Sequence, residues 1–117
     1  MRYEIPFALN CTLRPDAMPT LLALRADHLT YIHDHMDQIL FGGPVRGEDG
    51  VPQEMIILLR TDHRHEAEGF IHAEPYAASG KVFAGIQIRP WSQVVPEPSP
   101  GTLESSIAAE RSKIGQV

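Results

Sequence analysis

The chain has 117 residues and a formal net charge of −5, with 43% hydrophobic and 21% charged residues. This length and composition predict one globular domain with a sizeable core. No apolar run approaches the roughly 20 residues of a membrane-spanning helix. No cluster of Lys and Arg offers the phosphate neutralisation on which nucleic-acid binding depends. We therefore expect a soluble protein whose partners include neither membranes nor nucleic acid.

The cellular compartment is indicated by the first residues and by cysteine usage. The sequence MRYEIPFALN lacks the charged lead and long apolar stretch of a secretory signal, which favours the cytoplasm. Cys11 is the single cysteine, so no internal disulfide can form. Its apolar flanks predict a buried thiol rather than a nucleophile.

The first third of the chain predicts a strand followed by a helix. Within residues 2–12, Tyr3, Ile5 and Phe7 alternate with other residues, which predicts a strand with its odd-numbered face inward. Pro6 favours placement at an edge or a bulge. After two prolines, a helix can begin at residues 19–20 and run to about residue 37. Its expected apolar stripe consists of Leu22, Leu29, Ile32, Met36 and Ile39.

The remainder up to residue 90 predicts two strands, a helix and a final strand. Glycine-rich residues 39–50 indicate a kinked strand and a turn. Residues 53–61 are rich in Ile and Leu and form the clearest strand. Asp62 can cap a second helix, which Pro75 and Gly80 bring to an end. Residues 81–90 alternate in period two, typical of a half-buried strand.

The predicted order βαββαβ belongs to the ferredoxin-like α+β class, an antiparallel four-stranded sheet with two helices on one face. The helices leave the other sheet face uncovered, and we expect that face to present Phe7, Ile57 or Phe83. A second copy packed face to face would bury it as a dimeric α+β barrel, with edge pairing or a long tail as competing solutions.

Residues 92–117 are expected to form an extension of the domain at residues 1–91. Three alternate prolines in WSQVVPEPSPG indicate a stiff, extended segment. Thr102 can then cap a short helix with Ile107, Ala108 and Ile114 on one side. This tail either clasps its own subunit or a dimer partner, or is disordered beyond Pro100.

Three segments resemble the YCII (YciI-like) family in order and spacing. RADHL, from Arg25 to Leu29, is similar to the family's Arg-x-x-His-Leu on the first helix. GGPV, from Gly42 to Val45, resembles its Gly-Pro segment. AEPYAASGKVFAGIQIRPW is similar to the family's ending of Asp-Pro-aromatic, small residues and final strand. The resemblance spans residues 1–91 and implies a small α+β barrel domain that dimerises.

The resemblance also implies a catalytic pair. The family's histidine corresponds to His28, and its aspartate position is occupied by Glu74, which has one more methylene. An imidazole can move protons near neutral pH while a carboxylate at its other nitrogen fixes its orientation. We expect a small cleft between helices and sheet, with substrate-binding roles for Arg25, Tyr31, Gly43, Pro44 and Tyr76. Asn10 could equally line such a cleft.

The other histidines are expected to be solvated or structural. His33 and His35 point about 200° apart around a helix, so they cannot chelate one ion. His28 and His35 are two turns apart, and a metal shared by them would need Glu74 between them. We therefore predict no metal and no cofactor.

Two functions from different classes follow. The first is an enzyme in which His28 is the general base and acid and Glu74 orients it, catalysing an isomerisation, elimination or ring opening. Its substrate is expected to be a small, oxygenated or aromatic molecule, as the chemistry of lactone isomerases and dehalogenating family members implies. The alternative is a dimer that binds or senses a metabolite without transforming it.

Overall fold

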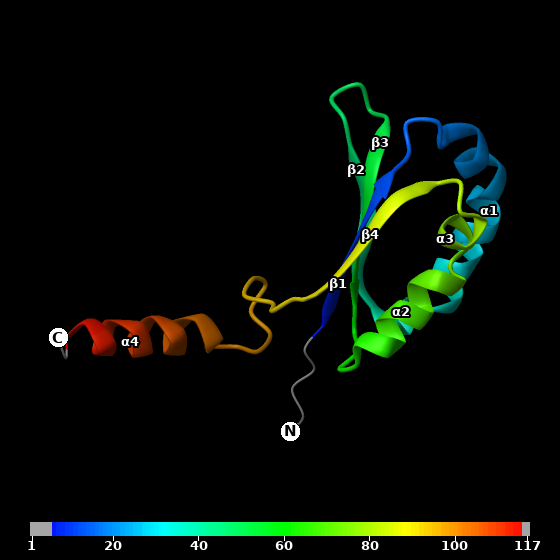
Figure 1. The fold of residues 1–117 in the computed structure, drawn as a ribbon. Helices are drawn as coiled ribbons and strands as arrows, with labels where there is room; N and C mark the ends of the chain where they lie inside the picture. The colour runs from blue at the N-terminus through cyan, green and yellow to red at the C-terminus, as the bar shows by residue number, and fades with distance from the viewer. Residues whose placement is uncertain (1–5, 116–117) are drawn as a thin grey trace.

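The computed structural model describes residues 6–115, and its elements alternate in the predicted order (Figure 1). In chain order they are β1 (Phe7–Leu13), α1 (Met18–Asp34), the short 3-10 helix η1 (Met36–Gln38), β2 (Ile39–Arg46), β3 (Pro52–Leu59), α2 (Arg64–Ala73), α3 (Pro75–Ser79), β4 (Phe83–Pro90) and α4 (Thr102–Gly115).

The four strands form one antiparallel sheet in the order β2-β3-β1-β4. Helices α1, α2 and α3 cover one face of this sheet, and α4 extends away on the other side (Figure 1). The predicted α+β ferredoxin-like fold is therefore confirmed. Its second helix is divided into α2 and α3 by Pro75, since proline disfavours helical backbone in the residue before it.

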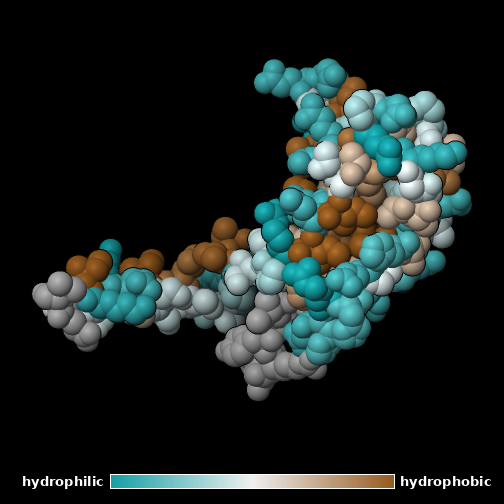
Figure 2. Space-filling view, in the orientation of Figure 1, coloured by the Kyte–Doolittle hydropathy of each residue, from teal (hydrophilic) through white to brown (hydrophobic). Residues whose placement is uncertain are grey.

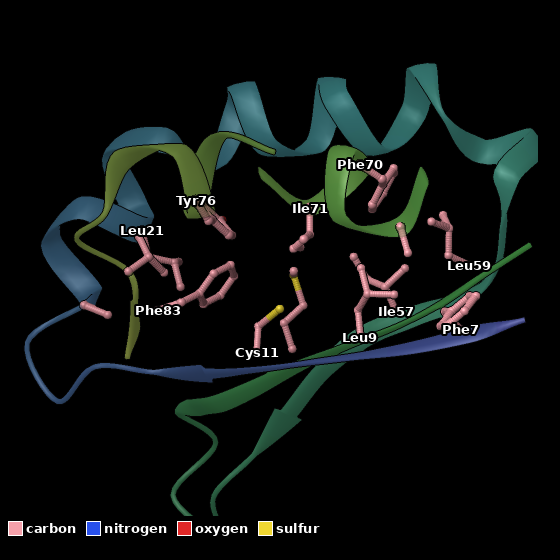
Figure 3. Close-up of a cluster of buried hydrophobic side chains, with 14 residues drawn as sticks. Phe7, Leu9, Cys11, Leu21, Ile57, Leu59, Phe70, Ile71, Tyr76 and Phe83 are labelled. Carbon is pink, nitrogen blue, oxygen red and sulfur yellow. The ribbon is translucent and has the colours of Figure 1, made fainter. Parts of the chain in front are cut away.

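The inward face of β1 agrees with the sequence pattern. Phe7, Leu9 and Cys11 are buried beneath the helices (Figure 3), whereas Tyr3 and Ile5 lie outside the described residues. The placement of Pro6 was wrong in one respect. The strand begins after it, at Phe7, and β1 lies between β3 and β4, so Pro6 interrupts no ladder and marks no edge strand.

The residues expected on the uncovered sheet face lie on the covered face instead. Phe7, Ile57 and Phe83 are 7%, 2% and 7% exposed and belong to the core (Figure 3). Cross-strand partners share a face. Ile57 pairs with Leu9 on the covered face, so its neighbours along β3, Ile56 and Leu58, lie on the uncovered face. The uncovered face also presents Phe41 and Val45 of β2.

The predicted apolar stripe is correct for Ile32 and Ile39, which pack against the core, and wrong for its other three residues. Leu21 is the buried residue of α1, whereas Leu22 and Leu29 are 62% and 47% exposed. Apolar residues occur on several sides of this helix, so periodicity alone could not select the buried one. The helix ends at Asp34, earlier than predicted, and the chain reaches β2 through η1.

The ends of α2 and α3 use local polar contacts. The N-cap residue of α2 is His63 rather than Asp62, and the His63 amide donates to the Thr61 hydroxyl. At the other end, Gly80 follows α3 with φ of 69°, a left-handed conformation that glycine adopts without steric cost. The predicted stop at Gly80 is confirmed.

The C-terminal helix stands apart from the sheet and the other helices. None of the residues of α4 is buried, and Figure 2 shows apolar residues along this arm, separate from those gathered between the sheet and the helices. A clasp onto its own subunit is therefore not formed. With 100° per residue, Leu103 rather than Ala108 shares one side of the helix with Ile107 and Ile114.

Candidate functional site

The centre of the site is a histidine and a carboxylate from distant parts of the sequence. His28 Nδ1 and Glu74 Oε1 are 2.5 Å apart, with His28 12% exposed and Glu74 fully buried. The backbone of α1 lies close to α3, which brings the two residues together. The structure thus juxtaposes the two residues that the sequence singled out.

Glu74 is held in place because it also begins a helix. It is the N-cap residue of α3, and its Oε2 accepts a hydrogen bond of 3.2 Å from the Ala77 amide. A carboxylate at this position satisfies an amide that has no partner within the helix. One oxygen therefore caps α3 while the other holds His28, and the extra methylene of Glu74 is accommodated.

Tyr76 covers one face of the His28 imidazole. The His28 and Tyr76 rings are stacked, with centroids 4.0 Å apart and planes 9° from parallel. Tyr76 is itself buried and packs edge-on against Phe83. With Nδ1 bound to Glu74 and one ring face covered, Nε2 is the nitrogen left for chemistry with a ligand.

The electrostatic surroundings keep two neighbouring acids protonated. Burial raises the pKa of Tyr76, the Arg25 guanidinium opposes this rise by its charge and a hydrogen bond, and the Glu74 carboxylate adds to it. Burial, assisted by Glu74, raises the pKa of the Cys11 thiol to about 12. At neutral pH the Tyr76 hydroxyl is therefore a hydrogen-bond donor, and Cys11 is an unreactive thiol.

A cavity of about 680 Å³ borders this pair, between α1 and the inner side of β2 and β3. Four of the five predicted substrate-binding residues line it together with His28. They are Arg25, Gly43, Pro44 and Tyr76. Glu74 is buried behind the imidazole, so it can act on a ligand only through His28.

Tyr31 is placed differently from the other predicted residues. It is absent from the cavity lining, and its hydroxyl donates a 2.7 Å hydrogen bond to the Phe70 carbonyl. Its ring stacks on His35, with centroids 4.1 Å apart. Tyr31 therefore ties α1 to α2, and a contact with substrate stays a prediction.

Asn10 lies outside the cavity, on the uncovered sheet face. It pairs with Ile56 of that face, and its side-chain oxygen accepts a hydrogen bond from Arg89. The role considered for it in the cleft is therefore not supported.

The two histidines at the C-terminal end of α1 do not join the site. His33 is a surface residue with 76% of its side chain exposed, and His35 Nδ1 is 2.7 Å from the Tyr31 carbonyl. Within residues 6–115, no group of three or more His, Cys, Asp or Glu side chains could hold a metal ion. The mixed site of His28, His35 and Glu74 is therefore not formed.

Several lining residues were not predicted. The hairpin between β2 and β3 contributes Arg46, Val51 and Glu54, and α1 contributes the exposed Leu22 and Leu29. Leu22 and Leu29 were expected on the apolar stripe of the helix, and no local motif singles out the three hairpin residues. They could be found only from the way α1 lies over β2 and β3.

The chain was compared with protein families, curated proteins and solved structures. The YCII-related domain family matches residues 5–92. Comparison with curated proteins gives no match. A solved structure with the same fold is 5-chloro-2-hydroxyhydroquinone dehydrochlorinase (TftG) from Burkholderia phenoliruptrix AC1100, in complex with 2,5-dihydroxybenzoquinone. The two chains are 21% identical with a TM-score of 0.70, and the match covers 77% of this chain and 96% of that one.

No helix within residues 6–115 combines the length and the apolar character that crossing a bilayer requires.

Proposed function

We propose that this chain, which belongs to the YCII-related domain family, is a small-molecule enzyme that uses His28 for general acid and base chemistry. The observation that carries the proposal is the 2.5 Å contact between His28 and buried Glu74 at the wall of the cavity. Such a pair can supply a base whose tautomer and orientation are fixed before a substrate binds.

The proposed reaction class is isomerisation or elimination. The Nε2 atom of His28 takes a proton from a substrate carbon or hydroxyl, and Glu74 stabilises the imidazolium that forms. The released electron pair makes a new C=C or C=O bond. In an isomerisation an adjacent double bond of the substrate gives up its π electrons to another atom, and that atom takes the proton back from His28. In an elimination a leaving group such as chloride departs with its bonding electrons, and His28 passes the proton to water. The dehydrochlorinase that shares this fold supports the elimination.

Tyr76 and Arg25 have supporting roles in this proposal. The Tyr76 hydroxyl, which is protonated at neutral pH, can donate a hydrogen bond to a substrate oxygen. Arg25 can hold the negative charge of an acidic substrate at the same place, because its guanidinium lies beside that hydroxyl.

The proposal is tested by chloride release from 5-chloro-2-hydroxyhydroquinone, measured by ion chromatography. Replacing His28→Gln is expected to lower the rate about 10²–10⁴-fold, the usual contribution of general acid and base catalysis. The matched control is His33→Gln, an exposed histidine of the same helix, which is expected to retain the rate of the unmodified protein.

Two results would contradict the enzyme proposal. One is equal rates for His28→Gln and the unmodified protein. The other is chloride release by the unmodified protein no faster than in buffer, in which case the alternative of a metabolite-binding dimer would replace it.

The partner we propose is a second copy of this chain, packed on the uncovered sheet face. That face carries Phe41, which is 54% exposed, together with Val45 and Ile56, and α4 projects from the same side (Figure 1). A partner there would cover the sheet and give α4 a surface to pack on. Light scattering is expected to give twice the chain mass of 13.0 kDa, and half of that value for Phe41→Glu. A monomeric mass of the unmodified protein would contradict the dimer.

A further inference from the structure

We infer that the cavity beside His28 takes an elongated, largely apolar organic acid, which extends along the cavity beyond a single ring seated at His28. The inference deepens the proposed function, and it rests on that proposal for the position of the acidic group at His28. The ligand class follows from three features of the cavity: its length, the reason it exists and the chemistry of its walls.

The length is set by the part of α1 that lines the cavity. The lining residues of this helix run from Met18 to Ile32, which at 1.5 Å per residue is about 21 Å. The volume of about 680 Å³ falls within the range of about 300–1,000 Å³ that is typical of sites for drug-sized ligands. A single ring beside His28 would leave most of this length in contact with water.

The cavity exists because two side chains of β2 are too small to fill it. Gly42 pairs with Ile57, and Pro44 pairs with Met55, so both face the helices. Above them, α1 stands further from the strands than from α3. A Cβ added at Gly42 would meet the Ile57 and Ile39 side chains at 3.6 and 3.8 Å, which are ordinary contacts. A larger residue fits the backbone here, and its side chain would extend into the cavity.

The walls are apolar along most of the length. Leucine, isoleucine and methionine side chains contribute from both sides, and the apolar lining residues of α1 are Met18, Leu21, Leu22, Leu29 and Ile32. Removing apolar surface from water stabilises a complex in proportion to the area removed. A ligand that extends along these walls therefore gains affinity from its apolar part.

Positive charge is concentrated on one wall of the cavity. Arg25 lies beside Tyr76 and next to His28. The second lining arginine, Arg46, lies at the hairpin and donates to the Gly50 carbonyl there. Arg25 is thus the cation available to a ligand, and we place the acidic group of the ligand against Arg25, His28 and Tyr76.

The test compares two organic anions by isothermal titration calorimetry. The elongated probe is 1-anilinonaphthalene-8-sulfonate, and the single-ring probe is benzoate. The unmodified protein is expected to bind the elongated probe with one site and at least about tenfold more tightly than benzoate, because more apolar surface is buried.

Two variants separate the length of the cavity from its charge. Gly42→Leu is expected to lower the affinity for the elongated probe about tenfold and to change the affinity for benzoate less than about twofold. Arg25→Gln is expected to lower the affinity for both probes to a similar extent. The control is Gly69→Leu, an exposed position of α2 with no neighbour within 4 Å of the added Cβ, which is expected to change neither affinity. Thermal unfolding of each variant verifies that it is folded.

Three results would overturn the inference. The first is an affinity for benzoate equal to that for the elongated probe. The second is an equal loss of affinity for the elongated probe in Gly42→Leu and Gly69→Leu. The third is an unchanged affinity for both probes in Arg25→Gln. Each leaves the proposed acid and base chemistry intact, since chloride release that depends on His28 is measured without these probes.

Discussion

The two halves of the sheet are covered in opposite ways. Strands β1 and β4 lie beneath α2, and the inner side chains of β1 are closely packed, with Leu9 and Cys11 fully buried. Strands β2 and β3 lie beneath α1, which leaves a cavity of about 680 Å³ above Gly42 and Pro44. The packed half fixes the position of Glu74, and the open half provides room for a ligand. His28 lies where the two halves meet.

This division separates stability from binding within one small domain. A side chain can be held firmly only where its neighbours are densely packed, and a ligand can enter only where they are not. Glu74 is held in the densely packed part, and His28 borders the cavity that a ligand can enter.

The largest effect is expected for the reactivity of Cys11 in the packed half. Its pKa of about 12, raised from 9.0, leaves about a thousandfold less thiolate at pH 8 than an unperturbed thiol has, since each pKa unit is a factor of ten. We expect 5,5′-dithiobis(2-nitrobenzoate) to react at least a thousandfold more slowly with the folded protein than with the protein in urea. Similar rates would show that this half is open to solvent.

The raised pKa of Cys11 also predicts that the free energy of unfolding falls at high pH. The unfolded chain releases the thiol proton near pH 9, whereas the folded chain retains it to about pH 12. The Cys11 contribution is therefore fully present below pH 9 and decreases between pH 9 and 12. Urea unfolding at pH 8 and 10.5 is expected to show this decrease, and Cys11→Ala should show a smaller one.

The next largest effect compares one leucine from each half. Leu9→Ala removes a fully buried side chain, so the free energy of unfolding should fall by about 2–5 kcal/mol. Leu29→Ala in the cavity wall, where the side chain is 47% exposed, should cost less than about 1 kcal/mol. Urea denaturation measures both, and equal losses would contradict the division into halves.

A smaller loss is expected when the buried carboxylate is removed. Glu74→Ala leaves the Ala77 amide without its cap and His28 without its partner. We expect a loss of about 1.5–3 kcal/mol, typical of hydrogen bonds to a charged group, in the same denaturation experiment. Glu104→Ala, an exposed carboxylate of α4, is the control with little expected change. No loss in Glu74→Ala would mean that the carboxylate is not held as described.

The smallest effect concerns Tyr31, which connects α1 to the packed half. Tyr31→Phe removes the hydrogen bond to the Phe70 carbonyl, so stability should decrease by about 0.5–1.5 kcal/mol. Because Tyr31 does not line the cavity, affinity for 1-anilinonaphthalene-8-sulfonate should change less than about twofold. A larger loss of affinity would restore the substrate contact predicted from sequence.

The packed half was more predictable from sequence than the open half. The alternation of Phe7, Leu9 and Cys11 indicated the inner face of β1, because a strand has a period of two. Helix α1 has leucines on several sides, and its choice of Leu21 over Leu22 depends on the position of α3. Such tertiary contacts leave no periodic signal in the sequence.

The site was predictable only in part, and mainly through resemblance to a family. That resemblance selected His28 and Glu74, which the structure brings into contact. It could not show that Glu74 also caps α3, which depends on the break at Pro75. Nor could it show the cavity, because its walls come from α1 and a hairpin that are distant in sequence.

In the proposed mechanism His28 and Glu74 act as one unit, and a double-mutant cycle on chloride release measures the coupling between them. We expect Glu74→Gln to lower the rate at least about tenfold in the unmodified protein and less than about twofold in His28→Gln, since groups that act as a unit are not additive. Equal losses in both backgrounds would contradict the account.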